Sequence, residues 1–414
     1  MKMVMLTAAL PCILWAGAAW ASENGEADLK EEVQILFTHD MHSHLDSYKA
    51  EKDGKTAMIG GFAKLKTMAE EKRAACPATF LVDGGDFSMG TLYQTIFELE
   101  APELTMMGQI GYDAVTLGNH EFDYRSQGLA NMLHAAKNHE KEHPDHGLPA
   151  LVSANIDWTK NTSEDNLLVK EAMEAYGSTP YIVIERGGVK AGIFGVLGKD
   201  ADECAPESGL EFGDIVETSR QVTEQLQKEQ VDLIICLSHS GTSEKEDKSE
   251  DEILAQKVPE IDLIISGHTH TTLDNPIQHG DTYIVSAGSY CENLGELHLT
   301  RKENGRWNLE EYRLNPLDET VKEDAQIKAQ LEEYKQIVNE EYLARFGYTF
   351  DQVLAENPVE FTQMDEFAET LEEDPLGSII ADSYVYAVQK AEGEQYEKVY
   401  VTISPSGAIR DTFQ

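Results

Sequence analysis

The sequence predicts an α/β protein made of two packed sheets with helices on their outer faces. In the first half, apolar strand-like runs alternate with helical patterns, which is typical of a mainly parallel sheet covered on both sides. In the second half, glycine-centred turns at residues 187–188 and 304–305 join apolar runs, which indicates antiparallel hairpins. The length of 414 residues favours about two domains over one compact core.

The elements of the first half follow from hydrophobic periodicity and from two prolines. Pro77 ends the first helical pattern, and Pro102 stands near a helix start. The strand-like runs are residues 33–38, 79–86, 114–117 and 150–156, and the helical patterns are residues 60–73, 93–111 and 126–138.

The later part of the chain contributes the second sheet and then changes character. Its strand-like runs and helix are residues 181–197 (a hairpin), 219–229 (the helix), 233–239, 263–270 and 283–288. Apolar positions at Ile327, Leu331, Tyr334 and Val338 fall on one helical stripe, which predicts a connector helix of roughly 25 residues. Beyond it we expect a helix at residues 377–390 and a strand at 398–403, in a unit that looks like an incomplete domain.

The charge balance limits the possible partners. Asp+Glu 75 against Lys+Arg 33 gives a net charge of −42, which repels the backbone of DNA or RNA, so we expect no nucleic-acid polymer as partner. A small phosphorylated molecule would be repelled as well, unless bound metal cancelled the local field.

Residues 1–21 read as a secretory signal. Lys2 precedes an apolar run over residues 3–18, and Ala19-Trp-Ala21 is a small-x-small cleavage pattern. The run is short for a membrane anchor, and no second apolar span follows. We therefore expect cleavage after Ala21, a secreted, periplasmic or cell-surface location, and no transmembrane segment in the mature chain. The remaining cysteines, Cys76, Cys204, Cys236 and Cys291, are compatible with buried thiols or with disulfides.

Polar groups follow five of the strand-like runs. The carboxyl ends of strands in open α/β sheets are where ligands bind, so these groups predict a common site. They are Asp40 and His42, then Asp86, then Asn119, His120 and Asp123, then His239, and finally His268 and His270.

These residue types predict a metal centre. Imidazole nitrogen, carboxylate oxygen and an amide carbonyl suit Mn, Zn, Co, Fe or Mg better than a thiolate-binding metal. The Asp-x-His and His-x-His spacings put both side chains on one face of an extended segment, and Asp86 after Gly84-Gly85 could bridge two ions. Two ions can clamp a phosphoryl group and activate a water, with His120 as proton donor and Asp123 orienting it.

The alternative is that each group is an ordinary strand-end residue, which would hold for any of them alone but leaves their clustering unexplained. His39 and His44 are expected either as ligands or as supports for them. His134, His139, His143 and His146 lie in a Lys/Glu-rich stretch that predicts a solvated helix end and loop.

The same motifs resemble those of the calcineurin-like dinuclear metallophosphoesterases. The matching segments are Asp40-x-His42, Gly85-Asp86, Gly118-Asn-His-Glu-Phe-Asp123, Ser238-His239 and Gly267-His-Thr-His270, in family order across residues 33–300. The resemblance implies a four-layer αββα sandwich. It implies that Asp40, His42, Asp86 and His270 hold one metal, that Asp86, Asn119, His239 and His268 hold the other, and that His120 with Asp123 forms the catalytic pair.

Within that family, the chain is similar to the secreted 5′-nucleotidase, UDP-sugar hydrolase and cyclic-phosphodiesterase branch. Residues 376–382 resemble the Leu-Gly-Asn-Leu-Ile-Ala-Asp segment of its substrate domain, and residues 405–410 resemble its Asn-x-Gly-Gly-Ile-Arg loop. Arg410 would then bind substrate, although Pro405 and Ala408 depart from the loop pattern. The implied units are a signal peptide (1–21), a catalytic domain (22–316), a connector helix (317–347) and a partial substrate-binding domain (348–414).

The resemblance implies an exported phosphatase that hydrolyses nucleoside 5′-monophosphates by attack of a metal-activated water, in nucleotide catabolism. The alternatives are a 2′,3′-cyclic-nucleotide phosphodiesterase with 3′-nucleotidase activity, a UDP-sugar hydrolase, or a sulfur-compound hydrolase on the same scaffold. An inactive or surface-binding module with a vestigial site is the alternative from a different class.

Overall fold

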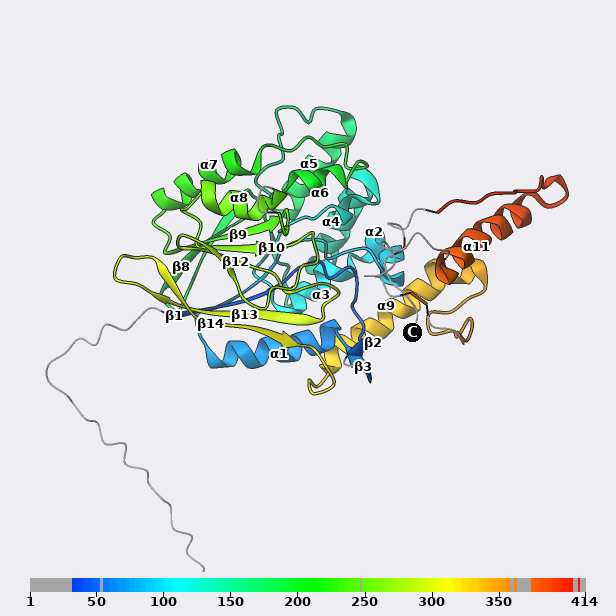
Figure 1. Ribbon diagram of the computed structural model, residues 1–414, viewed down its shortest axis with the longest axis horizontal. Helices are drawn as coiled ribbons and strands as arrows, with labels where there is room; N and C mark the ends of the chain where they lie inside the picture. The colour runs from blue at the N-terminus through cyan, green and yellow to red at the C-terminus, as the bar shows by residue number, and fades with distance from the viewer. Residues whose placement is uncertain are drawn as a thin grey trace, which may run out of the picture.

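A computed structural model describes residues 32–52, 55–245, 248–357, 361–362, 374–404 and 409. The signal sequence and Arg410 lie outside the described residues. Two six-stranded sheets pack against each other, and helices cover their outer faces (Figure 1). This arrangement confirms the four-layer αββα sandwich.

The first sheet has the strand order β14-β13-β1-β4-β5-β6. Strands β1, β4, β5 and β6 run parallel, whereas β13 and β14 add an antiparallel edge that includes the predicted turn at 304–305. The bounds are β1 (Glu32–Thr38), β4 (Thr79–Asp83), β5 (Ala114–Val115), β6 (Ala150–Leu151), β13 (Asn293–Arg301) and β14 (Trp307–Pro316).

The second sheet has the order β11-β12-β10-β9-β8-β7. Its central strands are parallel, and the predicted hairpin at residues 187–188 joins the antiparallel pair β7 and β8. The bounds are β7 (Tyr181–Arg186), β8 (Val189–Leu197), β9 (Leu233–His239), β10 (Leu263–Ser266), β11 (Ile277–His279) and β12 (Thr282–Val285). A separate hairpin, β2 (Tyr48–Lys52) with β3 (Lys55–Ile59), is not predicted by the sequence.

Three apolar cores hold the layers together. In β1, Ile35 and Phe37 face the core between the sheets, while Leu36 faces the helices, as strand alternation requires. The helices of the first layer are α1 (Phe62–Ala75), η1 (Leu92–Ile96), α2 (Phe97–Glu100), α3 (Pro102–Ile110), η2 (His120–Phe122), α4 (Arg125–Glu142) and α5 (Glu164–Tyr176). Beside the second sheet lie α7 (Ile215–Lys228) and α8 (Glu250–Lys257), whereas α6 (Lys199–Glu203) contributes Ala201 to the first core.

The predicted helix at residues 93–111 is in fact broken into η1, α2 and α3. Ala101 takes a left-handed conformation with φ of 45°, and Pro102 starts α3. Proline lacks an N–H and disfavours helical backbone in the residue before it, so the apolar periodicity continues while the helix does not.

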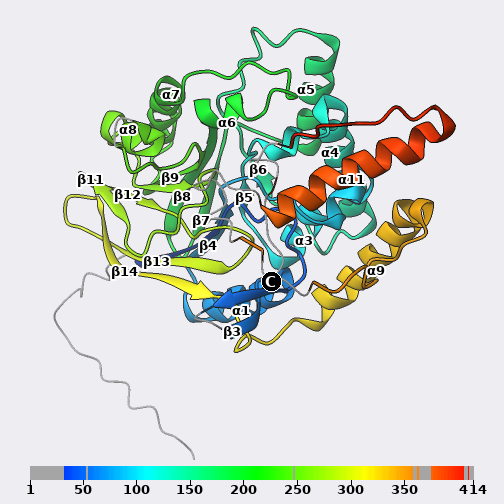
Figure 2. The ribbon, with the colours of Figure 1, turned by 45° about the vertical axis from the view of Figure 1, so that its right-hand side comes forward.

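The predicted connector helix packs against the first core. It is α9 (Ala325–Glu341), with 17 residues, followed by η4 (Leu343–Phe346), and its predicted apolar stripe is buried. Tyr334 and Thr105 of α3 share a hydrogen bond of 2.6 Å between their hydroxyl groups. The helix therefore belongs to the layer that covers the first sheet, as Figure 2 also shows.

Two predicted strands are wrong in extent or existence. The run at residues 150–156 pairs as a strand only over Ala150–Leu151, because its neighbour β5 offers just two residues. Residues 398–403, which follow α11 (Pro375–Glu392) and η5 (Gly393–Gln395), form no strand. Tyr400, Val401 and Ile403 are exposed, and no described strand lies beside them to complete a ladder.

No disulfide joins the four cysteines that the structure describes, and Cys236 and Cys291 are buried thiols. Among the described residues, no helix is both long and apolar enough to cross a membrane.

Candidate metal centre

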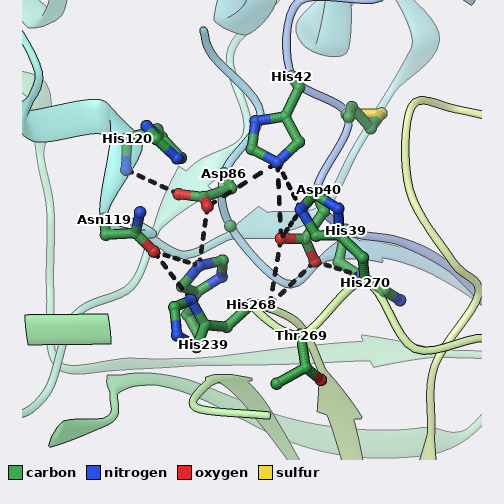
Figure 3. Close-up of polar contacts among 12 residues, drawn as sticks. His39, Asp40, His42, Asp86, Asn119, His120, His239, His268, Thr269 and His270 are labelled. Atoms are coloured by element: carbon green, nitrogen blue, oxygen red, sulfur yellow. Dashed lines mark hydrogen bonds and ion pairs between the residues drawn. The ribbon is translucent and has the colours of Figure 1, made fainter. Parts of the chain in front are cut away.

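The structure brings all seven predicted metal-ligating side chains together at one edge of the sandwich. They follow strands of both sheets, so the site lies where the two sheets meet (Figure 3). The residues are Asp40 and His42 after β1, Asp86 after β4, Asn119 after β5, His239 at the end of β9, and His268 and His270 after β10.

Five of these seven residues have backbone conformations that non-glycine residues rarely adopt. Their φ angles are 49° at Asp40, 48° at His42, 53° at Asp86, 78° at His268 and 53° at His270. Such strain persists only where the surroundings enforce it, and it concentrates at functional sites. The chain turns sharply after each strand, which aims the side chains at one another.

One group of ligand atoms comes from Asp40, His42 and His270, all within 4.8 Å of one another. The Nε2 atoms of His42 and His270 are 2.8 Å apart. The Oδ1 atom of Asp40 lies 3.8 Å from the first of these nitrogens and 3.5 Å from the second. Two imidazoles and a carboxylate thus face a common point.

A second group comes from Asp86, His239 and His268, again within 4.8 Å. The Oδ1 atom of Asn119 joins it, at 3.2 Å from His239 Nε2 and 2.9 Å from His268 Nδ1. Asp86 connects the two groups, because its Oδ2 lies 3.1 Å from His239 Nε2 and 4.0 Å from His42 Nε2. This is the bridging position that the sequence predicts for Asp86.

Hydrogen bonds behind the ligands fix their orientation. His239 Nδ1 lies 2.9 Å from the Gly84 carbonyl oxygen, so Nδ1–H donates there and Nε2 faces the site. His39 Nε2 accepts the Ala287 N–H at 2.6 Å, which leaves its Nδ1–H to donate to Asp40 at 2.5 Å. His39 therefore supports a ligand and is not one itself.

His44 also supports the site. Its Nδ1 lies 2.9 Å from the carbonyl oxygen of His42, and its ring packs against those of Tyr48 and Tyr290.

Burial and neighbouring charges set the protonation states of these side chains. Burial lowers the pKa of His42 to about 3 and also lowers the pKa of His270, so both rings are neutral at pH 7. Burial opposes ionisation of Asp40 and Asp86, but neighbouring histidines hold the pKa of each carboxyl below its usual value. Burial alone would lower the pKa of His239, yet the Asp86 carboxylate raises it to about 10. A cation between Asp86 and His239 would replace that proton.

The donor set fits divalent metal ions. It offers neutral imidazoles, ionised carboxylates and an amide oxygen, which suit Mn, Zn, Co, Fe or Mg. The His42 Nδ1 atom is buried and has no hydrogen-bond partner, so the ring relies on its Nε2 side for polar contacts. Two ligand groups that share one carboxylate match the arrangement of a two-metal site.

The predicted catalytic pair lies beside this centre. His120 Nδ1 is 2.9 Å from Asp123 Oδ2, and its ring meets that of His42 edge to face at 5.2 Å between centroids. The backbone N–H of His120 donates to Asp86 Oδ1 at 2.8 Å. The pair is therefore attached to the bridging carboxylate.

Glu121 is an important residue that sequence reasoning missed. Its buried carboxylate accepts hydrogen bonds from the backbone N–H groups of Gly118, Asp86 and Ser88, at 2.6, 3.1 and 3.0 Å, and from the Ser88 hydroxyl at 2.8 Å. It ties the loop after β4 to the loop after β5. Its place between His120 and Asp123 was the available signal, but no spacing rule shows that its side chain points inward.

The other histidine cluster does not join the centre. His139, His143 and His146 stack on one another at the far end of α4, with ring centroids 4.6 to 5.9 Å apart, and His134 is exposed. Arg410 lies outside the described residues.

Comparison with known proteins agrees with this geometry. Residues 33–272 match the family model for calcineurin-like phosphoesterases. The chain is 30% identical over 400 residues to the trifunctional nucleotide phosphoesterase of Bacillus subtilis, covering 92% of this chain and 25% of that protein. It is also 30% identical over 330 residues to the rat 5′-nucleotidase, covering 73% of this chain and 52% of the relative. It thus spans about a quarter to a half of these relatives.

Solved structures show the same fold. The 5′-nucleotidase precursor of Thermus thermophilus superposes with a TM-score of 0.69 at 24% identity, covering 87% of this chain and 68% of that one. Since the family model matches more than half of the residues, and the motifs it shares converge on one centre, the chain belongs to the calcineurin-like phosphoesterase family.

Proposed function

We propose that the protein is an exported, metal-dependent phosphatase that hydrolyses nucleoside 5′-monophosphates. The observation that carries this proposal is the convergence of two ligand groups on the shared carboxylate of Asp86, with His120 and Asp123 beside them. Membership of a phosphoesterase family supports the same reaction type.

The proposed ligands divide between two ions. Asp40, His42, Asp86 and His270 would hold one, and Asp86, Asn119, His239 and His268 the other. When bound, the ions would neutralise the phosphoryl oxygens and activate the attacking water. They would also cancel the repulsion that a net charge of −42 imposes on an anionic substrate.

In this proposal the residues of the chain position the substrate and move protons. Asp123 accepts a hydrogen bond from the Nδ1–H of His120. This bond fixes the orientation of the ring and stabilises its imidazolium form, so that the Nε2–H can donate to a phosphoryl or leaving-group oxygen. Asp86 keeps His120 in register through the 2.8 Å bond from its backbone N–H. General acid catalysis of this kind contributes about 10²- to 10⁴-fold to the rate.

The substrate class rests on the relatives and on the C-terminal segment. Relatives named as 5′-nucleotidases match this chain at 28 to 30% identity, and the match to the Bacillus subtilis nucleotide phosphoesterase extends over 92% of the chain. We propose that residues 348–414 belong to a substrate-binding unit and that Arg410 contacts the nucleotide. Two relatives are named as snake venom enzymes, which agrees with export through the signal sequence at residues 1–21.

The test is phosphate release from 5′-AMP by the purified chain, before and after EDTA and again after Mn²⁺ is restored. We expect activity to be lost and recovered, and to be abolished in His120→Ala. The sequence of the mature N-terminus tests export, with Ser22 expected as the first residue.

Assays of other phosphate esters, run beside 5′-AMP, distinguish the alternative functions. Turnover of 2′,3′-cyclic AMP or UDP-glucose in preference to 5′-AMP would reassign the substrate within the family. Failure to bind Mn²⁺ and to cleave any of these esters would overturn the proposal of an enzyme and favour a binding module with a vestigial site.

A further inference from the structure

His268 presents its two ring nitrogens to different surroundings. Nδ1 lies 2.9 Å from Asn119 Oδ1, inside the proposed catalytic centre (Figure 3). Nε2 points the other way and lies 2.9 Å from Asp200 Oδ2, on helix α6. The side chain of Asp200 is 70% exposed, so the outer nitrogen of a buried ligand faces a solvent-accessible carboxylate.

Helix α6 adds a thiol to this outer face. Cys204 follows Asp200 by one helical turn, which places both side chains on the same side of the helix. Ligand atoms of Asp200, Cys204 and His268 all lie within 4.8 Å of one another. Cys204 is exposed, and a cation could therefore reach the three groups directly from solvent.

The short helix is held in place by its neighbours. The backbone N–H groups of Lys199 and Asp200 donate to the Glu250 carboxylate at 2.8 and 3.0 Å. The N–H of Gly198, just before the helix, donates to the carbonyl oxygen of His239 at 2.9 Å. The outer face of His268 is therefore built on an anchored turn that is attached to the catalytic strand β9.

The donors differ in kind from those of the catalytic centre. A thiolate, an imidazole and a carboxylate together prefer Zn²⁺ or its analogue Cd²⁺, whereas the catalytic set contains no sulfur. The strongly acidic chain attracts divalent cations to its surface in general. The thiol makes this one location selective for thiophilic ions.

We propose that Asp200, Cys204 and His268 form an inhibitory site for a thiophilic divalent cation, with Zn²⁺ as the physiological ligand. This inference rests on the proposed function, because it requires that His268 Nδ1 binds the second catalytic ion. Binding releases the Sγ proton of Cys204 and the Nε2 proton of His268 to solvent. Asp200 then turns from accepting the Nε2–H to coordinating the outer cation.

The consequence is competition for one imidazole. The outer cation takes Asp200 away from the hydrogen bond that orients the ring, pulls the ring towards α6 and repels the catalytic ion, so Nδ1 holds that ion less tightly. Loss of such a supporting interaction lowers metal affinity by about 10- to 100-fold. Zn²⁺ above the amount needed for catalysis would therefore slow turnover.

The first experiment detects the site without using activity. The full chain is titrated with Cd²⁺, and the ultraviolet charge-transfer absorbance of a cadmium–thiolate bond is recorded. We expect the parent chain and Cys76→Ser to show one saturable band, and Cys204→Ser to lose it. Cys76 is the matched control, because it is a half-buried thiol at the end of α1, far from α6 in sequence. An unchanged band in Cys204→Ser overturns the site.

The second experiment tests the coupling to the catalytic centre. Mn²⁺ affinity is measured by electron paramagnetic resonance with and without one equivalent of Zn²⁺, and the inhibition of 5′-AMP hydrolysis by Zn²⁺ is measured in parallel. In the parent, Zn²⁺ should weaken Mn²⁺ binding about 10-fold or more, and Cys204→Ser should keep its basal rate but need about 10-fold more Zn²⁺ for inhibition. Equal Zn²⁺ effects on both chains overturn the inference. If 5′-AMP is not a substrate, the cadmium band and the Mn²⁺ affinity still show whether the inhibitory site exists.

Discussion

Replacing Glu121 by glutamine tests whether this residue sets the geometry of the metal centre. The carboxylate accepts four hydrogen bonds, two at each oxygen, from the loops that carry Asp86 and Asn119. Glutamine has almost the same shape but only one acceptor oxygen. If its NH₂ group faced Gly118 and Asp86, two N–H hydrogen bonds would be lost. If it faced Ser88, it would oppose the Ser88 N–H while the Ser88 hydroxyl could turn to accept from it, so one or two hydrogen bonds are lost.

The magnitude follows from the number of bonds lost. A hydrogen bond to a charged group contributes about 1.5–3 kcal/mol, so losing one or two of them has a local cost of ~1.5–6 kcal/mol if the loops stay in place. Relaxation of the loops relieves part of this cost and moves Asp86 or Ser88. We therefore expect Mn²⁺ affinity to fall about 10- to 100-fold, as for other residues that support metal ligands.

The assay is calorimetric titration with Mn²⁺. Burial raises the pKa of Glu121 to about 7, so the titration is done about one pH unit higher, where the parent carboxylate is ionised. Glu103→Gln is the matched control. Glu103 is also buried near the site, but its only side-chain bond is to Ser43 at 2.5 Å, which the amide oxygen of glutamine can keep. We expect that variant to bind Mn²⁺ normally. Parent-like affinity in Glu121→Gln would refute the reasoning.

Three further predictions follow. His120→Ala should lower kcat about 10²- to 10⁴-fold while bound Mn²⁺, measured by atomic absorption, stays unchanged, and metal loss would contradict the role of His120. Gly118→Ala would place a methyl group 2.1 Å from Asp86 Oδ1, so we expect about 1–3 kcal/mol lower stability in denaturant titration together with weaker Mn²⁺ binding. Burial raises the pKa of Asp262 from 3.8 to about 6, so its carboxyl holds a proton in the folded chain that the unfolded chain releases. As the pH rises between these two values, the free energy of unfolding of the parent should therefore fall by up to about 3 kcal/mol more than that of Asp262→Asn. Identical pH profiles of stability in the two chains would exclude this effect.

The sequence was sufficient to predict the sandwich and the clustering of the candidate ligands because both depend on strand ends. A buried strand is apolar by necessity, so a histidine or aspartate directly after it stands out, as His239 does after β9 and Asp86 does after β4. Parallel strands bring such ends to one edge. The antiparallel hairpins were equally predictable, since Gly187-Gly188 and Asn304-Gly305 mark their turns.

What the sequence did not reveal depends on contacts between distant segments. Glu121 looked like a polar neighbour of His120, because only the folded loops show that four donors surround its carboxylate. The packing partner of the connector helix was not predictable either, because an apolar stripe does not say which surface it meets. In the structure, α9 meets α1 and η1. Residues 398–403 have strand-like composition, but pairing decides whether a strand forms.

The strained backbone of the centre has a physical cause in the loops that follow β1 and β4. These parallel neighbours continue to hydrogen bond beyond the sheet, from the N–H of Asp40 to the oxygen of Gly85 at 2.8 Å and from the N–H of His42 to the oxygen of Asp86 at 3.0 Å. The bonds force left-handed φ angles on Asp40, His42 and Asp86. Each such residue costs about 1–3 kcal/mol. A sequence selected for stability alone would place glycine at these positions, so the carboxylates and the imidazole found there favour the proposed role in holding metal ions.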